Sequence, residues 1–392
     1  MSIILTTKII TFFKESFTFD PLLPLHTPFF DIREEEYLVD CVRSNFVSSV
    51  GEYVNKFEEA LHDFTGSKHV ILCVNGTAAL HIALKLLDVS AHDEVLIPSM
   101  TFVATANAVS YCGAIPHFID VDEKNLGVNS KKLDDYLNKI VDFVEGKVIN
   151  KNTKRVIKAI VPMHTFGHPV DMDELKKVSK KYNLPIIEDS AESLGSFYKN
   201  IHTGLFGKLS ILSFNGNKII TTGGGGAILT QDEELAIKAK HITTTGKIPH
   251  KWEFYHDVIA YNYRLPALNS ALGLAQIEKL SVFVEKKRRL AEFYKEAFKD
   301  FDEFEFFVER DYAKSNYWLN AIILKPESEK LRDRILEETN NNGIMTRPVW
   351  KLLHTLPMYK DCPKMDLSVS ESLEKRIINI PSSAWLVDKI KV

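Results

Sequence analysis

The sequence lacks a patterned set of cysteines. Its four cysteines lie far apart, without a C-x-x-C pair or a neighbouring histidine cluster; they are Cys41, Cys73, Cys112 and Cys362. A disulfide framework or a structural zinc site needs closer spacing, so we expect neither, and we expect no other metal site. Cys73 lies in an apolar run, residues 70–74, and is predicted to be a small core residue.

Long hydrophobic runs are also missing. No stretch of 18 or more apolar residues occurs, which argues against a transmembrane helix. Residues 1–17 are apolar, but Lys8, Lys14 and Glu15 interrupt them and no small-residue cleavage site follows. We expect an amphipathic helix that packs on the body of the protein or on a partner chain, with attachment to a membrane surface as the alternative. The sequence therefore predicts a cytoplasmic protein without membrane insertion.

An excess of either charge is absent as well. The chain has 49 basic and 52 acidic side chains, a formal net charge of −3. A nucleic-acid binder usually carries a basic excess, so no nucleic-acid partner is expected. Hydrophobic residues make up 45% and charged residues 26%, values typical of globular chains. A chain of 392 residues can form a large core and a deep cleft, which favours an enzyme of two or three domains.

Short apolar runs alternate with helix-like stretches from about residue 36 to 265. This pattern is typical of an α/β domain with a mostly parallel central sheet flanked by helices. After Pro266, residues 267–298 predict one long helix or two in series, and strands at 317–324 and 344–349 flank a helix at 328–339. We predict an N-terminal helical or extended segment (1–35), a large domain (36–265) and a smaller α+β domain (266–392). The strands predicted in the large domain are 69–74, 94–97, 115–120, 156–163, 184–188, 209–214 and 227–230, with helices at 78–87 and 172–182.

The first motif with chemical character begins at Asn75, directly after a predicted strand, and opens a helix. The unpaired N–H groups and the dipole at a helix start together bind phosphate. Gly76 allows close backbone approach, and Thr77 adds a hydroxyl. The alternative is an ordinary helix start that Asn75 or Thr77 caps.

Two further motifs supply a carboxylate and an amine. Asp189 ends an apolar strand and is suited to bind a metal, act as a base or pair with a cation, or else to cap the next helix. Lys218 lies between a strand and the glycine run 223–226, where apolar neighbours favour a neutral, nucleophilic amine over the usual exposed lysine. The glycine run does not complete G-x-G-x-x-G, because position 228 is Ile228, so nicotinamide binding is weakly supported.

These three motifs make sense as one site. A phosphate-binding helix start, an aspartate able to hold a protonated ring nitrogen and a nucleophilic lysine are the groups that pyridoxal phosphate requires. We therefore predict this cofactor, with Lys218 and Asp189 as catalytic residues.

Longer motifs surround these residues and extend from about Pro24 to the C-terminus. They are VNGTAALH (74–81), PSMTFVATANAV (98–109), IIEDSAESLG (186–195), SFNGNKIITTGGGG (213–226), YNYRLPALNSALGL (261–274) and NIPSS (379–383). With them the chain resembles the DegT/DnrJ/EryC1/StrS family of sugar aminotransferases, which have the pyridoxal-phosphate-dependent transferase fold of type I. The resemblance implies that fold, with a large cofactor domain and a smaller C-terminal domain.

The resemblance also implies a role for each matching residue. Lys218 would bind the cofactor aldehyde covalently, Asp189 would hold the pyridine nitrogen and Phe102 would stack on the ring. Asn262 would reach the phosphate of the neighbouring subunit's cofactor, which implies a homodimer with a shared active site. The residues expected around the phosphate are Gly76, Thr77, Ala78 and Ser213.

Two positions depart from the family pattern. Glu192 stands where many relatives carry Gln or His beside the cofactor's phenolic oxygen. An ionised carboxylate cannot donate a hydrogen bond, so Glu192 would be protonated, turned away or bridged by water. Gly224 stands where an acidic residue is usual, which we interpret as local loop variation.

The narrower resemblance is to the branch that aminates C4 of nucleotide-linked 4-keto-6-deoxy-N-acetylhexosamines on the way to legionaminic-acid-type sugars of cell-surface polysaccharides. NFVSSVGEYVNKFEEAL (45–61) and SFNGNKIITTGGGG carry it. It implies a nucleotide-sugar substrate and L-glutamate as amino donor. Residues implied near the substrate are Arg264, Arg347, Trp350 and His354.

Other functions remain open from the residues alone. A 3-keto-sugar aminotransferase shares every motif, and a pyridoxal-phosphate-binding regulator would keep the pocket without turnover. Lys218 argues against a sugar 3-dehydratase, which has His at this position in the same fold. His164 is expected to be a hydrogen-bonded histidine at a strand end and not a catalyst.

Overall fold

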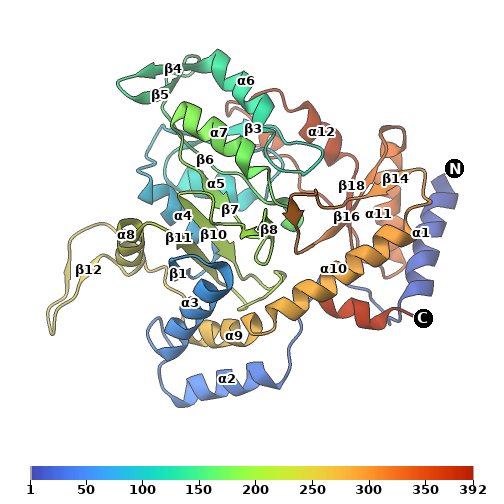
Figure 1. Cartoon of the computed structure of the whole chain (residues 1–392), viewed down its shortest axis with the longest axis horizontal. Coiled ribbons are helices and arrows are strands. Elements are labelled where there is room, and N and C mark those ends of the chain that lie inside the picture. Colours follow the sequence, from blue (N-terminus) through green and yellow to red (C-terminus); the bar gives the residue numbers. More distant parts are fainter. Residues whose placement is uncertain (1, 392) are drawn as a thin grey trace.

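The computed structural model describes residues 2–391 and is built around a mostly parallel sheet (Figure 1). Isolated parallel bridges, Ile160 to Ile186 and Met163 to Asp189, join two groups of strands into the order β1-β11-β10-β7-β6-β2-β3. β11 is antiparallel to both neighbours and the other pairs are parallel. The strands are β1 (His69–Cys73), β2 (Glu94–Pro98), β3 (Ile115–Ile119), β6 (Ile157–Ile160), β7 (Ile187–Asp189), β10 (Leu209–Ser213) and β11 (Gly226–Thr230). The predicted fold class is confirmed, and the predicted strands agree within three residues at each end.

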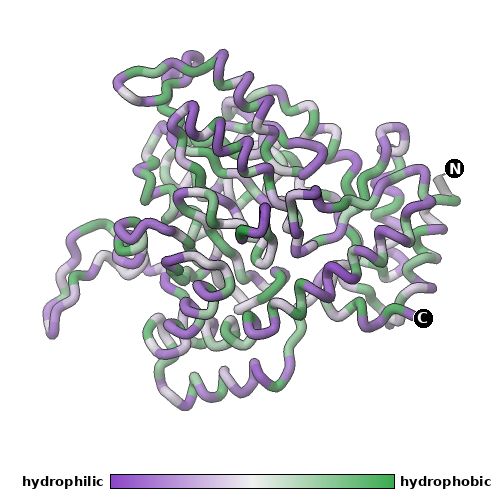
Figure 2. The backbone as a smooth tube through the Cα atoms, viewed as in Figure 1, coloured by the Kyte–Doolittle hydropathy of each residue, from purple (hydrophilic) through white to green (hydrophobic). Residues whose placement is uncertain are grey.

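Helices cover both faces of this sheet, because successive residues of a strand point to opposite sides. Ile71 joins one buried cluster with α4, whereas its neighbour Leu72 joins another with α3 and α9. Cys73 is fully buried in the first cluster, as predicted. Helices before residue 266 are α2 (Ile32–Arg43), α3 (Glu52–Thr65), α4 (Gly76–Leu86), α5 (Val103–Tyr111), α6 (Ser130–Ile140), α7 (Met172–Tyr182) and α8 (Glu233–Thr243). Figure 2 shows hydrophobic and hydrophilic residues alternating along outer helices, as expected where one face is buried.

The C-terminal part has an antiparallel sheet in the order β14-β16-β18-β17. Its strands are β14 (Phe304–Phe306), β16 (Asn320–Leu324), β17 (Arg347–Pro348) and β18 (Ile377–Ile380), and its helices are α9 (Ala267–Ile277), α10 (Leu280–Ala297), α11 (Arg332–Asn341) and α12 (Ser368–Glu374). Residues 267–298 therefore form two helices in series. α9 packs against α2 and α3, so both parts of the chain share one core cluster, and the predicted division at residue 266 stays a prediction.

Three predicted elements in this part differ from the sequence-based expectation, and one of them, the strand predicted at 344–349, is shortened to β17 (Arg347–Pro348). The strand predicted from residue 317 begins at Asn320, because Asn316 and Trp318 form a turn whose side chains reach the loops after β7 and β10. Tyr317 within that turn has φ 47°, outside the strand region. The helix predicted at 328–339 is a 3₁₀ turn, Pro326–Leu331, followed by α11.

The N-terminal helix α1 (Ser2–Ser16) packs on the C-terminal part, so the body of the protein, and not a partner chain, covers its apolar face. Leu5, Ile9 and Phe13 recur every four residues and are buried in one cluster with Tyr294 of α10. Figure 1 shows both termini on the same side of the molecule. No helix between residues 2 and 391 is long and apolar enough to span a membrane.

Short strands outside these sheets were not predicted, and one pair forms a projecting arm. β12 (Lys247–Ile248) and β13 (Tyr255–His256) extend away from the body (Figure 1). Trp252, Phe254 and Ile259 in or beside this arm are 73%, 79% and 92% exposed, which is unusual for large apolar side chains. The remaining short strands are β4 (Val141–Val144), β5 (Lys147–Asn150), β8 (Phe197–Tyr198), β9 (Ile201–His202) and β15 (Ala313–Lys314).

Candidate active site

The carboxyl ends of several central strands converge on one cavity. Its volume is about 300 Å³, at the lower end of the range of small-molecule sites. Ligands collect at this edge of open α/β sheets, because the loops after the strands meet there. The predicted residues that line the cavity are Gly76, Thr77, Phe102, Asp189, Glu192, Ser213, Lys218 and Trp350.

The start of α4 forms one wall of the cavity. The N–H groups of Gly76 and Thr77 lie in the first helical turn, where no intrahelical acceptor exists. A Cβ atom on Gly76 would lie 3.1 Å from the Cβ of Ser213, so glycine allows this serine to stand beside the helix start. The N–H of Ala78 instead donates to Oδ1 of Asn75 at 2.7 Å. The Ala78 N–H thus takes part in the helix cap, and its predicted contact with the phosphate stays a prediction.

Asp189 lies at the buried end of β7. It is 2% exposed, and its Oδ2 accepts a 2.7 Å hydrogen bond from the hydroxyl of Thr105. Its Oδ1 accepts from the N–H of Ala191 at 3.2 Å. Burial raises the pKa of Asp189, whereas these two donors oppose that shift. The carboxylate is oriented toward the cavity and has no cation in direct hydrogen bond among the described residues, so it is suited to a cationic ligand group.

Lys218 extends from the loop after β10 into the same cavity. Its Nζ lies 3.2 Å from Oε1 of Glu192 and 3.9 Å from the centre of the Trp318 ring. The Trp318 indole N–H donates to the carbonyl of Asn217 at 2.7 Å, which fixes the residue before the lysine. Lys218 is thus a positioned amine and not a solvated surface lysine.

Two of these supporting residues were missed. Thr105 lies in the PSMTFVATANAV motif, and a hydroxyl in the first turn of α5 was a signal that could have been noted. Trp318 lies 100 residues beyond Lys218, and nothing local to it indicates the contact.

The assembled residues fit pyridoxal phosphate. Gly76 leaves a cradle beside Ser213 for a phosphate, and Asp189 offers a buried carboxylate to a protonated ring nitrogen. The amine of Lys218 is available to the aldehyde, and Phe102, half exposed at the start of α5, lies where a ring could stack. No cluster of three His, Cys, Asp or Glu side chains suited to a metal occurs in the described part of the chain.

Three of the four predicted substrate contacts lie outside this cavity, and Trp350 alone among them lines it. Arg264 pairs with Glu58 at 2.8 Å and is buried. Arg347 donates to Oδ1 of Asn340 at 2.8 Å, and the Nδ1 of His354 lies 2.7 Å from the hydroxyl of Ser99. Each of these groups thus has a partner within its own chain that the sequence did not reveal, and its contact with the substrate stays a prediction.

Asn262 is exposed and lies outside the cavity lining of its own chain. It forms an isolated antiparallel bridge with Thr244, at the base of the projecting arm. Its reach to a neighbouring subunit's cofactor stays a prediction.

His164 is fully buried beneath the site. Its Nε2 lies 3.0 Å from Glu188, and its Nδ1 accepts from the N–H of Val170 at 3.1 Å. Glu188 also accepts from the N–H groups of Gly204, Phe206 and Gly207. The interpretation of His164 as a hydrogen-bonded strand-end histidine is confirmed.

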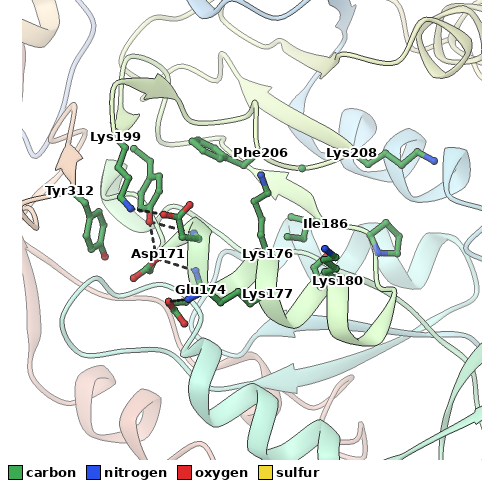
Figure 3. Close-up of a pocket in the computed structure, with 15 residues that line it drawn as sticks. Asp171, Glu174, Lys176, Lys177, Lys180, Ile186, Lys199, Phe206, Lys208 and Tyr312 are labelled. Atoms are coloured by element: carbon green, nitrogen blue, oxygen red, sulfur yellow. Dashed lines mark hydrogen bonds and ion pairs between the residues drawn. The ribbon is translucent and has the colours of Figure 1, made fainter.

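A larger hollow of about 840 Å³ lies on α7 and contains none of the predicted site residues (Figure 3). Two of its lysines pair with carboxylates of the same hollow: Lys199 with Asp173 at 2.5 Å, and Lys177 with Glu174. The hydroxyl of Tyr198 donates to Asp171 at 2.9 Å. This open hollow therefore lacks the convergent, buried groups of the cavity around Lys218.

Comparison with known proteins agrees with this geometry. The model of the DegT/DnrJ/EryC1/StrS aminotransferase family matches residues 30–389. GDP-perosamine synthase of Escherichia coli O157:H7 is 36% identical over 362 residues, covering 92% of this chain and 93% of that protein. The UDP-4-amino-4,6-dideoxy-N-acetyl-beta-L-altrosamine transaminase of Campylobacter jejuni NCTC 11168 is 34% identical over 334 residues, covering 84% and 85%.

A solved structure gives the same picture of the fold. Helicobacter pylori PseC, described as an aminotransferase involved in the biosynthesis of pseudoaminic acid, has a TM-score of 0.83 and 27% identity, covering 93% of this chain and 94% of that one. The chain therefore belongs to the DegT/DnrJ/EryC1/StrS aminotransferase family and is a pyridoxal-phosphate-dependent nucleotide-sugar aminotransferase.

Proposed function

We propose that the protein transfers an amino group from L-glutamate to C4 of a nucleotide-linked 4-keto-6-deoxy-N-acetylhexosamine, as in the legionaminic acid branch. The observation that carries the transaminase chemistry is the meeting of the Lys218 amine, the Asp189 carboxylate and the Gly76 helix start in one cavity. The N-acetylated sugar follows from the sequence resemblance, and the GDP-perosamine synthase relative makes a GDP-linked sugar the substrate to compare.

Each residue has a defined task in this reaction. Bound pyridoxal phosphate withdraws electrons from the carbon that carries the reacting amine, so that a proton on that carbon becomes acidic. Asp189 holds the proton on the ring nitrogen, and Thr105 fixes the orientation of that carboxylate. The N–H groups of Gly76 and Thr77, with the hydroxyl of Ser213, bind the phosphate. Lys218, once free, takes the acidic proton as general base and returns it as general acid to the carbon on the other side of the reacting nitrogen.

We also propose a homodimer in which Asn262 completes the partner's site. Asn262 is exposed beside an arm with exposed Trp252 and Phe254, and such apolar groups are expected to be covered in an assembly. A dimer at micromolar concentration in sedimentation analysis is expected, and a monomer that retains full activity would contradict it.

Product analysis tests the substrate. We expect the purified enzyme, with L-glutamate, to convert the UDP-linked 4-keto-6-deoxy-N-acetylhexosamine to its 4-amino product faster than the GDP-linked 4-keto-6-deoxyhexose. A preference for the GDP-linked sugar would reject the proposed branch, and amination at C3 would reject the proposed position. If glutamate alone does not change the absorbance of the bound cofactor, L-glutamate is not the amino donor.

A further inference from the structure

The proposed reaction gives Glu192 no task, although its carboxyl group is one of the most constrained in the cavity. It is 3% exposed, and its Oε1 lies 3.2 Å from the Nζ of Lys218. Its Oε2 accepts the N–H of Phe166 at 2.9 Å, in a turn where Phe166 has φ 56°. Asn316 donates to the Glu192 carbonyl at 2.9 Å. One carboxylate oxygen is therefore occupied by a backbone donor, and the other faces the amine.

The charged state of Glu192 depends on the positive charge of Lys218. Burial raises the pKa of Glu192 to about 7, although Lys218 and the Phe166 N–H oppose that shift, and the neighbouring Asp189 raises it further. On the other side of Lys218 lies the uncharged Trp318 ring. His26, also near Lys218, has its pKa lowered well below the usual value by burial and by nearby lysines, so it is neutral. Lys218 is thus the cation that balances Glu192.

We propose that Glu192 takes the ammonium proton of Lys218 when this lysine becomes covalently attached to an aldehyde, and stores it as long as the attachment lasts. The inference rests on the proposed role of Lys218. The proton leaves Nζ and binds Oε1, and the freed nitrogen lone pair forms the bond to the aldehyde carbon. The aldehyde oxygen leaves as water with the two remaining nitrogen protons. Ammonium, carboxylate and aldehyde thus give a carbon–nitrogen double bond, a carboxylic acid and water, with no net proton released.

Glu192 is expected to keep this proton, because leaving it ionised would cost free energy. An ionised Glu192 without the Lys218 cation would be a buried carboxylate beside Asp189, which is unfavourable.

Infrared spectroscopy of the cofactor-free protein gives the first test. Lys218→Met removes the cation and keeps the volume of the side chain. At about pH 8, the difference spectrum between Lys218→Met and Lys218→Met/Glu192→Gln should contain the carbonyl band of one protonated carboxylic acid. The corresponding difference between the wild type and Glu192→Gln should contain a carboxylate band. The absence of the acid band in a folded Lys218→Met protein, as judged by circular dichroism, would overturn the proposal.

Proton counting during cofactor capture gives the second test. Calorimetry of pyridoxal phosphate binding in buffers of different ionisation enthalpy measures the protons released. Between about pH 7.5 and 8.5, Glu192→Gln should release close to one proton more than the wild type. Proton release makes binding more favourable at higher pH. The affinity of Glu192→Gln for pyridoxal phosphate, divided by that of the wild type, should therefore rise about tenfold per pH unit.

A matched control separates this effect from a general change of charge. Glu371→Gln removes an exposed carboxylate outside the cavity and should release as many protons as the wild type. Equal proton counts for Glu192→Gln and the wild type would refute the stored proton. Neither test uses a sugar or an amino donor, so a failure of the proposed sugar specificity would leave both results unaffected.

Discussion

The hydrogen bond between Thr105 and Asp189 provides the sharpest quantitative test of the site. The hydroxyl of Thr105 donates to Oδ2 of Asp189 at 2.7 Å, and both residues are almost fully buried. Thr105→Val keeps the shape of the side chain and removes the donor. A hydrogen bond to a charged group contributes about 1.5–3 kcal/mol. If that energy supports the ionised carboxylate that holds the cofactor nitrogen, the dissociation constant of pyridoxal phosphate should rise about 10- to 100-fold.

The pH dependence of this loss has a definite sign. Thr105 lowers the pKa of Asp189, so its removal leaves burial to raise that pKa further. The carboxylate must be ionised to hold a protonated ring nitrogen, and its ionised fraction falls as the pH is lowered. The affinity of Thr105→Val should therefore decline at a higher pH than that of the wild type as the solution is acidified.

Equilibrium titration of the cofactor-free enzyme, followed by absorbance between about pH 6 and 8, measures both effects. Thr339→Val is the matched control, because Thr339 is equally buried but lies in α11 outside the cavity, where its hydroxyl donates to the carbonyl of Ile335. In an Asp189→Asn background the Thr105→Val change should cost less than about 1 kcal/mol, since the remaining hydrogen bond is neutral. If Thr105→Val binds the cofactor as tightly as Thr339→Val, the assignment of Asp189 as the charge that holds the ring is wrong.

Three other outcomes are expected. Phe13→Ala in α1 should lower the free energy of unfolding by about 3–5 kcal/mol, because Phe13 is fully buried. Ile4→Ala, at a position that is 60% exposed, should change it by less than about 0.5 kcal/mol. Thermal unfolding measures both, and equal effects would mean that α1 does not pack on the body of the protein. Lys218→Ala should bind pyridoxal phosphate only noncovalently, and a cofactor that borohydride still fixes to this variant would point to another nucleophile. Mixing equal amounts of Lys218→Ala and Asn262→Ala subunits should restore about a quarter of wild-type activity after subunit exchange. Half of the dimers are then mixed, and each mixed dimer carries one intact site out of two. No recovery would mean that each site is built from one chain.

The site residues that the sequence predicted are all recognisable from their immediate neighbours in the chain. Asp189 ends a β-strand, and Gly76 and Lys218 lie in the segments after one, so the role of each can be inferred from its immediate neighbours. A glycine at a helix start, a carboxylate after an apolar run and a lysine before a glycine run are features of a few residues. Parallel strands place their carboxyl ends at one edge, so the fold class alone brings these local features together.

The contacts that the sequence did not reveal involve partners that are distant in the sequence. Arg264 pairs with Glu58 of α3, more than two hundred residues earlier. His354 lies within hydrogen-bond distance of Ser99, which directly follows β2. The substrate contacts expected of Arg264 and His354 stay predictions. Trp318 was placed in a strand, because its apolar neighbours predict one, although Asn316 diverts this segment toward Lys218. No local pattern encodes such contacts, since they depend on which surfaces the whole chain brings together.

The cavity, like the sequence as a whole, has no excess of positive charge. Among the lining residues in the described part of the chain, Lys218 is the single lysine or arginine, and Glu192 already balances it. The start of α4 offers N–H groups for one phosphate, which the cofactor would occupy. A nucleotide sugar brings a diphosphate in addition, and neither Arg264 nor Arg347 lines the cavity. The donors for this diphosphate therefore lie outside the lining of this cavity, and the proposed second subunit is one source of them.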